Sequence, residues 1–217
     1  MGLGGCKSRL MGVVLLIMDR LDAGQSVLVV IDVQNDFCSP NGVVAKAGKD
    51  VSGAMELIPR LEDLIDGAHS AAVPVVFVRT THSDDTTSES WRFRTGDRES
   101  APNCVPGTWG AEFFSIKPGP ADHVVTKHRY SAFSSPEFTE LVAKLDRPSL
   151  LFCGVATNVC VETTLRDATC ADYFATLIED CSSAYEQGLH DGTVKNVRSS
   201  FGLVATSQEI LSHWHLS

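Results

Sequence analysis

The chain has little positive charge and no basic cluster. It carries 18 lysines and arginines against 27 aspartates and glutamates, which gives a net charge of −9. A nucleic-acid-binding surface needs clustered lysines and arginines to contact phosphates. We therefore expect no nucleic-acid partner.

Several sequence signatures of common enzyme classes are missing. The seven cysteines include no C-x-x-C pair and no regular spacing, which argues against a zinc ribbon or a disulfide framework and favours reduced thiols in a cytoplasmic enzyme. No G-x-S-x-G motif and no nucleotide-binding glycine loop occur either. Serine hydrolase and dehydrogenase assignments therefore have no support, and we expect no cofactor.

A long hydrophobic run is absent as well. The apolar stretch at residues 10–18 is too short to span a bilayer, and no convincing cleavage site follows it. The Met-Gly start resembles a myristoylation signal, but Cys6 stands where Ser or Thr is required. We interpret residues 1–25 as a loosely attached extension or a start-site artefact, and residues 26–217 as one domain without a membrane partner.

Apolar runs alternate with amphipathic segments along this domain, and 43% of residues are hydrophobic, enough for a substantial core. Runs without polar alternation, typical of strands buried on both faces, lie at residues 26–31, 75–78, 123–126, 149–154, 173–178 and 203–206. Helical patterns occupy residues 50–71, 135–145, 158–169 and 188–200. The alternation predicts a three-layer α/β/α fold with a mostly parallel sheet of about six strands. Residues 80–109 show little periodicity and are predicted to form a long functional loop.

The most informative segment is GVATNVCVETTLRD at residues 154–167. It places Cys160 after an apolar strand and at the start of a helix, where backbone N–H groups and the helix dipole favour a thiolate. An inert buried thiol is the alternative, since free cysteine is often a core residue.

Two further reactive residues follow predicted strands. Asp32 comes after the first strand and Lys127 after the third. The carboxyl ends of parallel strands share one edge of a sheet, so both should lie near Cys160. A lysine would favour the thiolate and a carboxylate would move a proton. Taken singly, Asp32 could cap a turn and Lys127 could be a solvated strand end.

Four segments carry a resemblance to a known family, in the family's order: DVQNDF at 32–37, CVPGTWGAEF at 104–113, KHRYSAF at 127–133 and the segment at 154–167. The sequence resembles the isochorismatase-like cysteine hydrolases over residues 26–206, with motif text similar to ureidoacrylate amidohydrolases. The resemblance implies a catalytic triad of Asp32, Lys127 and Cys160. It also implies a cis peptide at Val155–Ala156, with the amides of Ala156 and Cys160 as the oxyanion hole.

The resemblance further implies the reaction: cleavage of a C–N bond in a small amide or ureido substrate through a thioester, with release of ammonia. Isochorismatases proper tend to lack the nucleophilic cysteine, so Cys160 argues against that branch. Nicotinamidases carry a metal site with two histidines after the second strand, whereas RTTHSDD at residues 79–85 holds only His82. We therefore predict no metal.

Two alternatives stay open: a nicotinamidase-like amidase, and a non-catalytic relative that binds a metabolite. The family resemblance also implies a homodimer or homotetramer. Aromatic and arginine side chains are expected to bind the substrate, although for aromatic residues ordinary packing is a strong alternative. The predicted substrate-binding residues are Phe37, Trp91, Trp109, Tyr130, Phe133 and Arg79. A carboxylate on the substrate would be bound by Arg79, Arg92, Arg94 or Arg129.

Overall fold

A computed structural model describes residues 19–95 and 102–216 of the chain. Its centre is a six-stranded sheet, ordered β3-β2-β1-β4-β5-β6, in which every neighbouring pair is parallel. The strands are β1 (Ser26–Ile31), β2 (Val75–Thr80), β3 (His123–Lys127), β4 (Ser149–Val155), β5 (Phe174–Ser183) and β6 (Leu203–Ala205). The predicted α/β architecture and strand number are confirmed.

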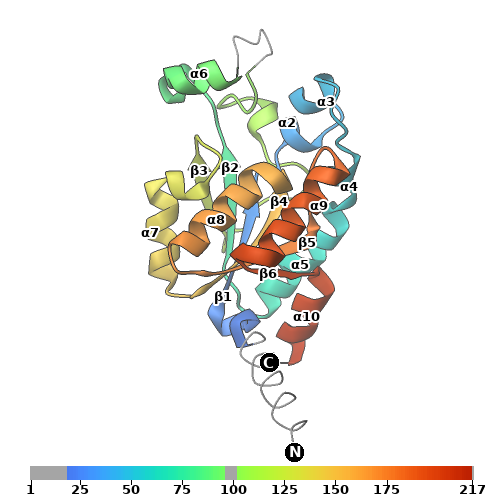
Figure 1. The fold of residues 1–217 in the computed structure, drawn as a ribbon, viewed down its shortest axis with the longest axis vertical. Helices are drawn as coiled ribbons and strands as arrows, with labels where there is room; N and C mark the ends of the chain where they lie inside the picture. The colour runs from blue at the N-terminus through green and yellow to red at the C-terminus, as the bar shows by residue number, and fades with distance from the viewer. Residues whose placement is uncertain (1–18, 96–101, 217) are drawn as a thin grey trace, which may run out of the picture.

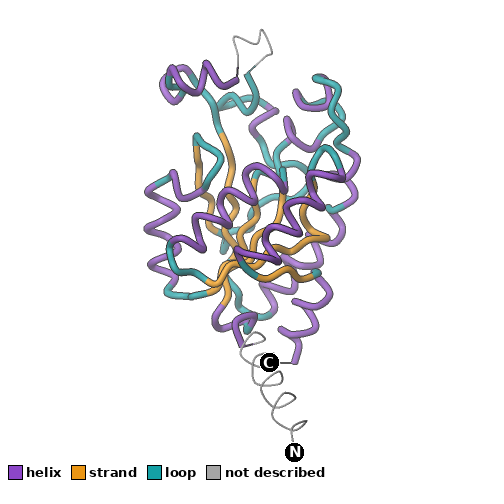
Figure 2. Tube along the Cα trace, viewed as in Figure 1, coloured by secondary structure: helices purple, strands orange, loops and turns teal. Residues whose placement is uncertain are grey.

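Helices cover both faces of the sheet (Figures 1 and 2). One apolar core lies between the sheet and α4 (Ser52–Glu56), α5 (Ile58–Ser70) and α10 (Ser207–Leu216). The other lies between the sheet and α7 (Pro136–Leu145), α8 (Glu162–Cys170) and α9 (Gln187–Asn196). Strand β1 is buried along its whole length because alternate side chains enter the two cores.

The remaining helical elements are short, and most lie near the carboxyl ends of the strands. They are η1 (Asp19–Leu21), η2 (Ala23–Gln25), α2 (Asn35–Cys38), α3 (Val43–Lys46), η3 (Asp84–Thr86), α6 (Glu89–Thr95), η4 (Trp109–Ala111), η5 (Ala132–Ser134), η6 (Thr157–Val161) and η7 (Val197–Phe201). No helix in the described ranges is both long enough and apolar enough to cross a bilayer.

Several parts of the structure differ from the sequence-based prediction, including α10, which was not predicted. The helix expected over residues 50–71 is divided at Leu57 into α4 and α5. Pro59 fits only the first turn of a helix, so α5 begins at Ile58, directly before it. The long predicted loop contains α6. Leu21 is buried, and its carbonyl accepts a hydrogen bond from Trp214 Nε1 (2.9 Å). The packed structure therefore includes part of the predicted extension. The rest of the extension, residues 1–18, lies outside the described residues.

Gly154 allows β4 to approach the end of β1 closely. Its φ is +111°, and a Cβ atom there would lie 2.0 Å from the carbonyl oxygen of Ile31. Both the backbone conformation and the contact exclude a larger residue. Since Ile31 precedes Asp32 and Gly154 precedes the Cys160 helix, this contact sets the distance between the two candidate catalytic elements.

Gly154→Ala is therefore expected to lower the free energy of unfolding by at least about 3 kcal/mol, measured by urea denaturation. Gly188→Ala is the matched control, because no atom lies within 4 Å of the added methyl group. The control should change the stability by less than about 1 kcal/mol. Equal effects of the two substitutions would contradict the requirement for glycine at position 154.

Candidate active site

The strand order reverses between β1 and β4, which are neighbours in the sheet although two strands separate them in sequence. Ligand sites in open parallel sheets form at such a switch point, beyond the carboxyl ends of the strands. Asp32 directly follows β1, and Cys160 lies five residues after β4 in η6. Lys127 is the last residue of β3, so all three predicted catalytic residues lie at this edge.

Lys127 reaches Asp32 across the intervening strand β2. Its Nζ donates to Asp32 Oδ2 (2.7 Å) and to Thr80 Oγ1 (2.5 Å), and the Thr80 hydroxyl in turn donates to Asp32 Oδ2 (3.3 Å). Both charged side chains are almost fully buried. Thr80, the last residue of β2, therefore connects the pair, a role that the sequence analysis did not anticipate.

Lys127 keeps its charge in this buried pair, and Asp32 leaves one oxygen unused. Burial alone would lower the pKa of Lys127, but Asp32 and then Cys160 outweigh it and raise that pKa above its usual value. Asp32 Oδ1 is buried and accepts no hydrogen bond from the described residues. A buried carboxylate oxygen without a hydrogen-bond donor costs free energy. Oδ1 is thus available to take a proton.

The Cys160 thiol interacts electrostatically with both members of the pair. Burial raises its pKa well above the usual value, and Asp32 raises it further, whereas Lys127 lowers it without compensating. Burial therefore outweighs the stabilisation of a thiolate that was expected from Lys127 and the helix start, and the resting group is a neutral thiol. A thiol beside an unoccupied carboxylate oxygen has its proton acceptor in place.

The backbone around Cys160 is irregular. The Val155–Ala156 peptide is cis, as predicted, and Cys160 lies in η6, a single π-helical turn that continues into α8. The Ala156 carbonyl accepts hydrogen bonds from the amides of Val159 (3.0 Å) and Val161 (3.3 Å). Thr164 Oγ1 donates to the Cys160 carbonyl (2.7 Å), which fixes the start of the turn to α8.

Polar side chains of the 32–37 segment hold the surrounding loops. Gln34 exchanges hydrogen bonds with the Thr80 backbone through its Nε2 (2.9 Å) and Oε1 (2.8 Å). Asp36 Oδ2 accepts from the Cys104 amide (2.7 Å), and Asn35 Nδ2 donates to the Trp109 carbonyl (2.7 Å). Two of the family-like segments, distant in sequence, therefore form one scaffold behind Asp32.

Two predicted substrate-binding aromatic residues meet beside Lys127, in a group that we call the Trp91 cluster: His82, Trp91, Arg129 and Tyr130. The Trp91 ring lies 5.8 Å from the His82 ring and 4.9 Å from the Tyr130 ring, centroid to centroid. The Arg129 guanidinium lies 5.1 Å from the Trp91 centroid. The Arg129 carbonyl accepts a hydrogen bond from Lys127 Nζ (3.1 Å), which connects the cluster to the predicted triad.

Arg79, also predicted to bind the substrate, lies away from the Trp91 cluster. Side chains alternate between the faces of a strand, so Arg79 and Thr80 point to opposite faces. Arg79 is exposed, and its Nε donates to Thr126 Oγ1 (3.0 Å), on the face away from Lys127.

The other predicted aromatic residues lie in different surroundings. Phe133 is partly buried and packs edge-on against Phe138 (5.0 Å) at the core under α7. Phe37, on α2, is half-buried and packs against the opposite core. Trp109 is 49% exposed, and its backbone carbonyl is held by Asn35.

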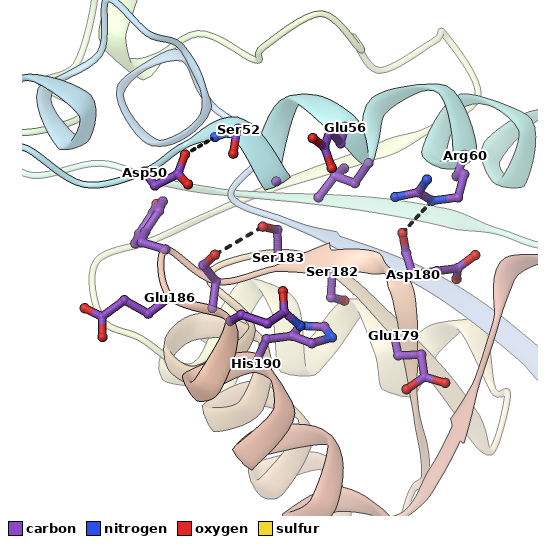
Figure 3. A pocket seen from close by; sticks show the side chains of 15 residues that line it. Asp50, Ser52, Glu56, Arg60, Glu179, Asp180, Ser182, Ser183, Glu186 and His190 are labelled. Carbon is purple, nitrogen blue, oxygen red and sulfur yellow. Dashed lines mark hydrogen bonds between the residues drawn. The ribbon is translucent and has the colours of Figure 1, made fainter.

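A polar cavity of ≈ 340 Å³ adjoins the site on the β5 side, between the end of β5 and α4 (Figure 3). None of the three predicted catalytic residues lines it. Two lining residues connect it to them: His190 Nδ1 bonds to Thr157 Oγ1 (3.0 Å) at the start of η6, and the pKa of Tyr185 is raised by burial and by Cys38, Cys160 and Asp32. Five carboxylates line this cavity: Asp50, Glu56, Glu179, Asp180 and Glu186.

Metal ligands are not grouped in the described part of the chain. No set of three or more histidine, cysteine, aspartate or glutamate side chains there is placed to hold an ion. The six cysteines within it are all free thiols.

Comparison with known proteins identifies a family and several relatives of the chain. Residues 26–209 match the isochorismatase domain family. The chain is 34% identical over 208 residues to the ureidoacrylate amidohydrolase RutB of Variovorax paradoxus (strain S110), covering 88% of this chain and 82% of that protein. It is 32% identical over 197 residues to RutB of Azorhizobium caulinodans, covering 84% and 87%.

Solved structures agree on the fold. A cysteine hydrolase from Pseudomonas syringae pv. phaseolicola 1448A superposes with a TM-score of 0.79 at 22% identity, covering 89% of this chain and 94% of that one. An isochorismatase family protein from Desulfovibrio vulgaris subsp. vulgaris str. Hildenborough superposes with a TM-score of 0.75 at 27% identity, covering 86% and 96%.

Proposed function

The chain belongs to the isochorismatase family, and we propose that it is a cysteine-dependent amidohydrolase that cleaves a C–N bond of a small ureido or carbamoyl compound. The observation that carries the proposal is the unused oxygen of Asp32, held by Lys127 beside a neutral cysteine thiol. The similarity to ureidoacrylate amidohydrolases favours a ureido substrate like theirs.

The first half-reaction begins with the thiol proton. Asp32 Oδ1 accepts this proton while Cys160 Sγ bonds to the substrate carbonyl carbon. The negative charge that develops on the carbonyl oxygen is stabilised by the amides of Ala156 and Cys160, and one such donor is typically worth about 3 kcal/mol. Asp32 then returns the proton to the leaving nitrogen, so that ammonia departs and a thioester remains.

Water completes the cycle. Asp32 takes a proton from a water molecule as the water oxygen attacks the thioester carbon. Asp32 then passes this proton to the departing Cys160 sulfur, which restores the starting state. Lys127 stays charged throughout, since its pKa is raised, and keeps Asp32 oriented through Oδ2. Thr80 acts as a positioning residue, because it touches both charged groups and no reacting atom.

An ammonia-release screen tests the substrate class. We expect turnover of ureidoacrylate to exceed that of biuret, N-carbamoyl amino acids, nicotinamide and simple amides, as judged by kcat/KM. Preference for nicotinamide would instead support the nicotinamidase-like alternative. Absence of turnover for every compound, in a folded protein, would favour a metabolite-binding role. A homodimer or homotetramer remains our expectation for the assembly.

A further inference from the structure

A ureido substrate that carries a carboxylate needs a second recognition site, apart from the atoms that react. Two polar regions adjoin the triad, and their charges differ. Five carboxylates and one guanidinium, that of Arg60, line the cavity on the β5 side, so its net charge is negative. The Trp91 cluster, on the β2–β3 side, contributes the Arg129 guanidinium. An anionic group on the substrate is repelled by the first region and attracted by the second.

Arg129 is half-buried and forms no ion pair with any described residue. Its Nη1 donates to the backbone carbonyls of Thr86 (2.9 Å) and His128 (2.6 Å). These bonds fix the guanidinium, while Nε and Nη2 donate to no described group. The carboxylate of Asp84, near Thr86 in sequence, pairs with Arg92 (3.3 Å) instead. A fixed guanidinium with two unused donors matches a carboxylate in geometry and charge.

His82 supplies a second unused polar atom in the same cluster. Its Nδ1 is buried and has no hydrogen-bond partner among the described residues. Burial and the charge of Lys127 lower the pKa of His82 to about 4, so the ring is neutral at pH 7. A neutral imidazole with its proton on Nδ1 can donate one hydrogen bond to an anion. The Trp91 ring lies beside both His82 and Arg129, and the charge of Arg129 acts on the His82 ring.

We propose that Arg129 and His82 bind the carboxylate of the substrate, and so determine that the enzyme prefers an anionic ureido compound to a neutral one. The inference rests on the proposed function, because the ureido end must lie at Cys160. Arg129 and His82 are specificity residues: they contact the substrate at the end that does not react.

The test compares ureidoacrylate with its methyl ester, which has the same ureido group and no negative charge. Binding is measured by calorimetry in the Cys160→Ala protein, and kcat/KM by ammonia release in the active enzyme. Arg129→Gln should weaken binding of the carboxylate by about 10- to 100-fold and reduce the preference for carboxylate over ester by a similar factor. The loss in the active enzyme should appear in KM more than in kcat.

Three further variants make the result specific. His82→Ala should weaken carboxylate binding by about 10-fold, whereas His82→Asn, whose amide nitrogen can replace Nδ1, should restore it to within about 3-fold of the unsubstituted protein. Arg79→Gln, on the opposite face of the sheet, is the matched arginine control and should leave the preference unchanged.

Equal weakening of carboxylate and ester by Arg129→Gln would overturn the inference, as would equal binding of the two compounds before any substitution at Arg129. Neither of those results affects the proposed function, which fails separately if the Cys160→Ala protein still releases ammonia. If neither compound binds or is turned over, both the inference and the proposed ureido substrate are wrong.

Discussion

The Cys160→Ala protein is expected to lose at least about 10⁴-fold in kcat while retaining its fold, because removal of a covalent nucleophile leaves only the residual effects of binding and the oxyanion donors. Cys160→Ser should be almost as inactive. A serine hydroxyl is far less acidic than a thiol, and even the thiol here needs Asp32 to remove its proton. The measurement is ammonia release under saturating substrate.

Circular dichroism and the melting temperature separate a chemical defect from a structural one. Cys160 is half-buried at the edge of a core, so the melting temperature should fall by only a few degrees. Cys170→Ala is the matched control, since Cys170 is an exposed free thiol at the end of α8. It should keep full activity. A Cys160→Ala protein with most of its activity would refute the proposed mechanism.

The second large effect is expected at Lys127. Replacement by methionine leaves the Asp32 carboxylate buried without its partner, which typically costs about 3–5 kcal/mol. Urea denaturation at pH 7 measures the loss. The pKa of Lys127 is raised in the folded protein, so its contribution is complete below its unfolded pKa of about 10.4 and disappears only at higher pH. The difference between the two proteins should therefore persist from pH 7 to pH 9.

A double-mutant cycle distinguishes loss of the pair from loss of packing. Asp32→Asn combined with Lys127→Met removes both charges, and the double variant should be more stable than Lys127→Met alone. The coupling between the two positions should exceed about 1 kcal/mol, because they are in contact. Additive effects on the free energy of unfolding would show that the lysine contributes by filling space. Both single variants should lack hydrolase activity.

Strands β1, β2 and β4 were predictable from sequence because each contains an uninterrupted apolar run, which few structures other than a doubly covered parallel sheet can bury. The sheet then places Asp32, Lys127 and Cys160 at one edge without further information. The division of residues 50–71 at Leu57 was only partly predictable. Pro59 shows where a helix can begin, but it does not show that the residues before Leu57 form a separate short helix, α4.

Other features depend on tertiary contacts that no local pattern records. Thr80 gains its importance from lying between β1 and β3, and sequence spacing does not show which strand separates them. The thiol of Cys160 is neutral because burial outweighs Lys127, and the balance between burial and charge needs coordinates. Arg79 and Thr80 are adjacent, yet only the register of β2 decides which one faces Lys127.

The first and last described elements touch each other at the amino ends of the strands, opposite α6 in Figure 1. His213 Nε2 lies 2.6 Å from Asp22 Oδ1, and the Trp214 indole bonds to the Leu21 carbonyl. A short linker between these segments would close the polypeptide without disturbing the catalytic edge. The fold is thus suited to circular permutation, and an affinity handle or surface attachment placed near Asp22 or Trp214 would leave the opposite edge accessible to substrate.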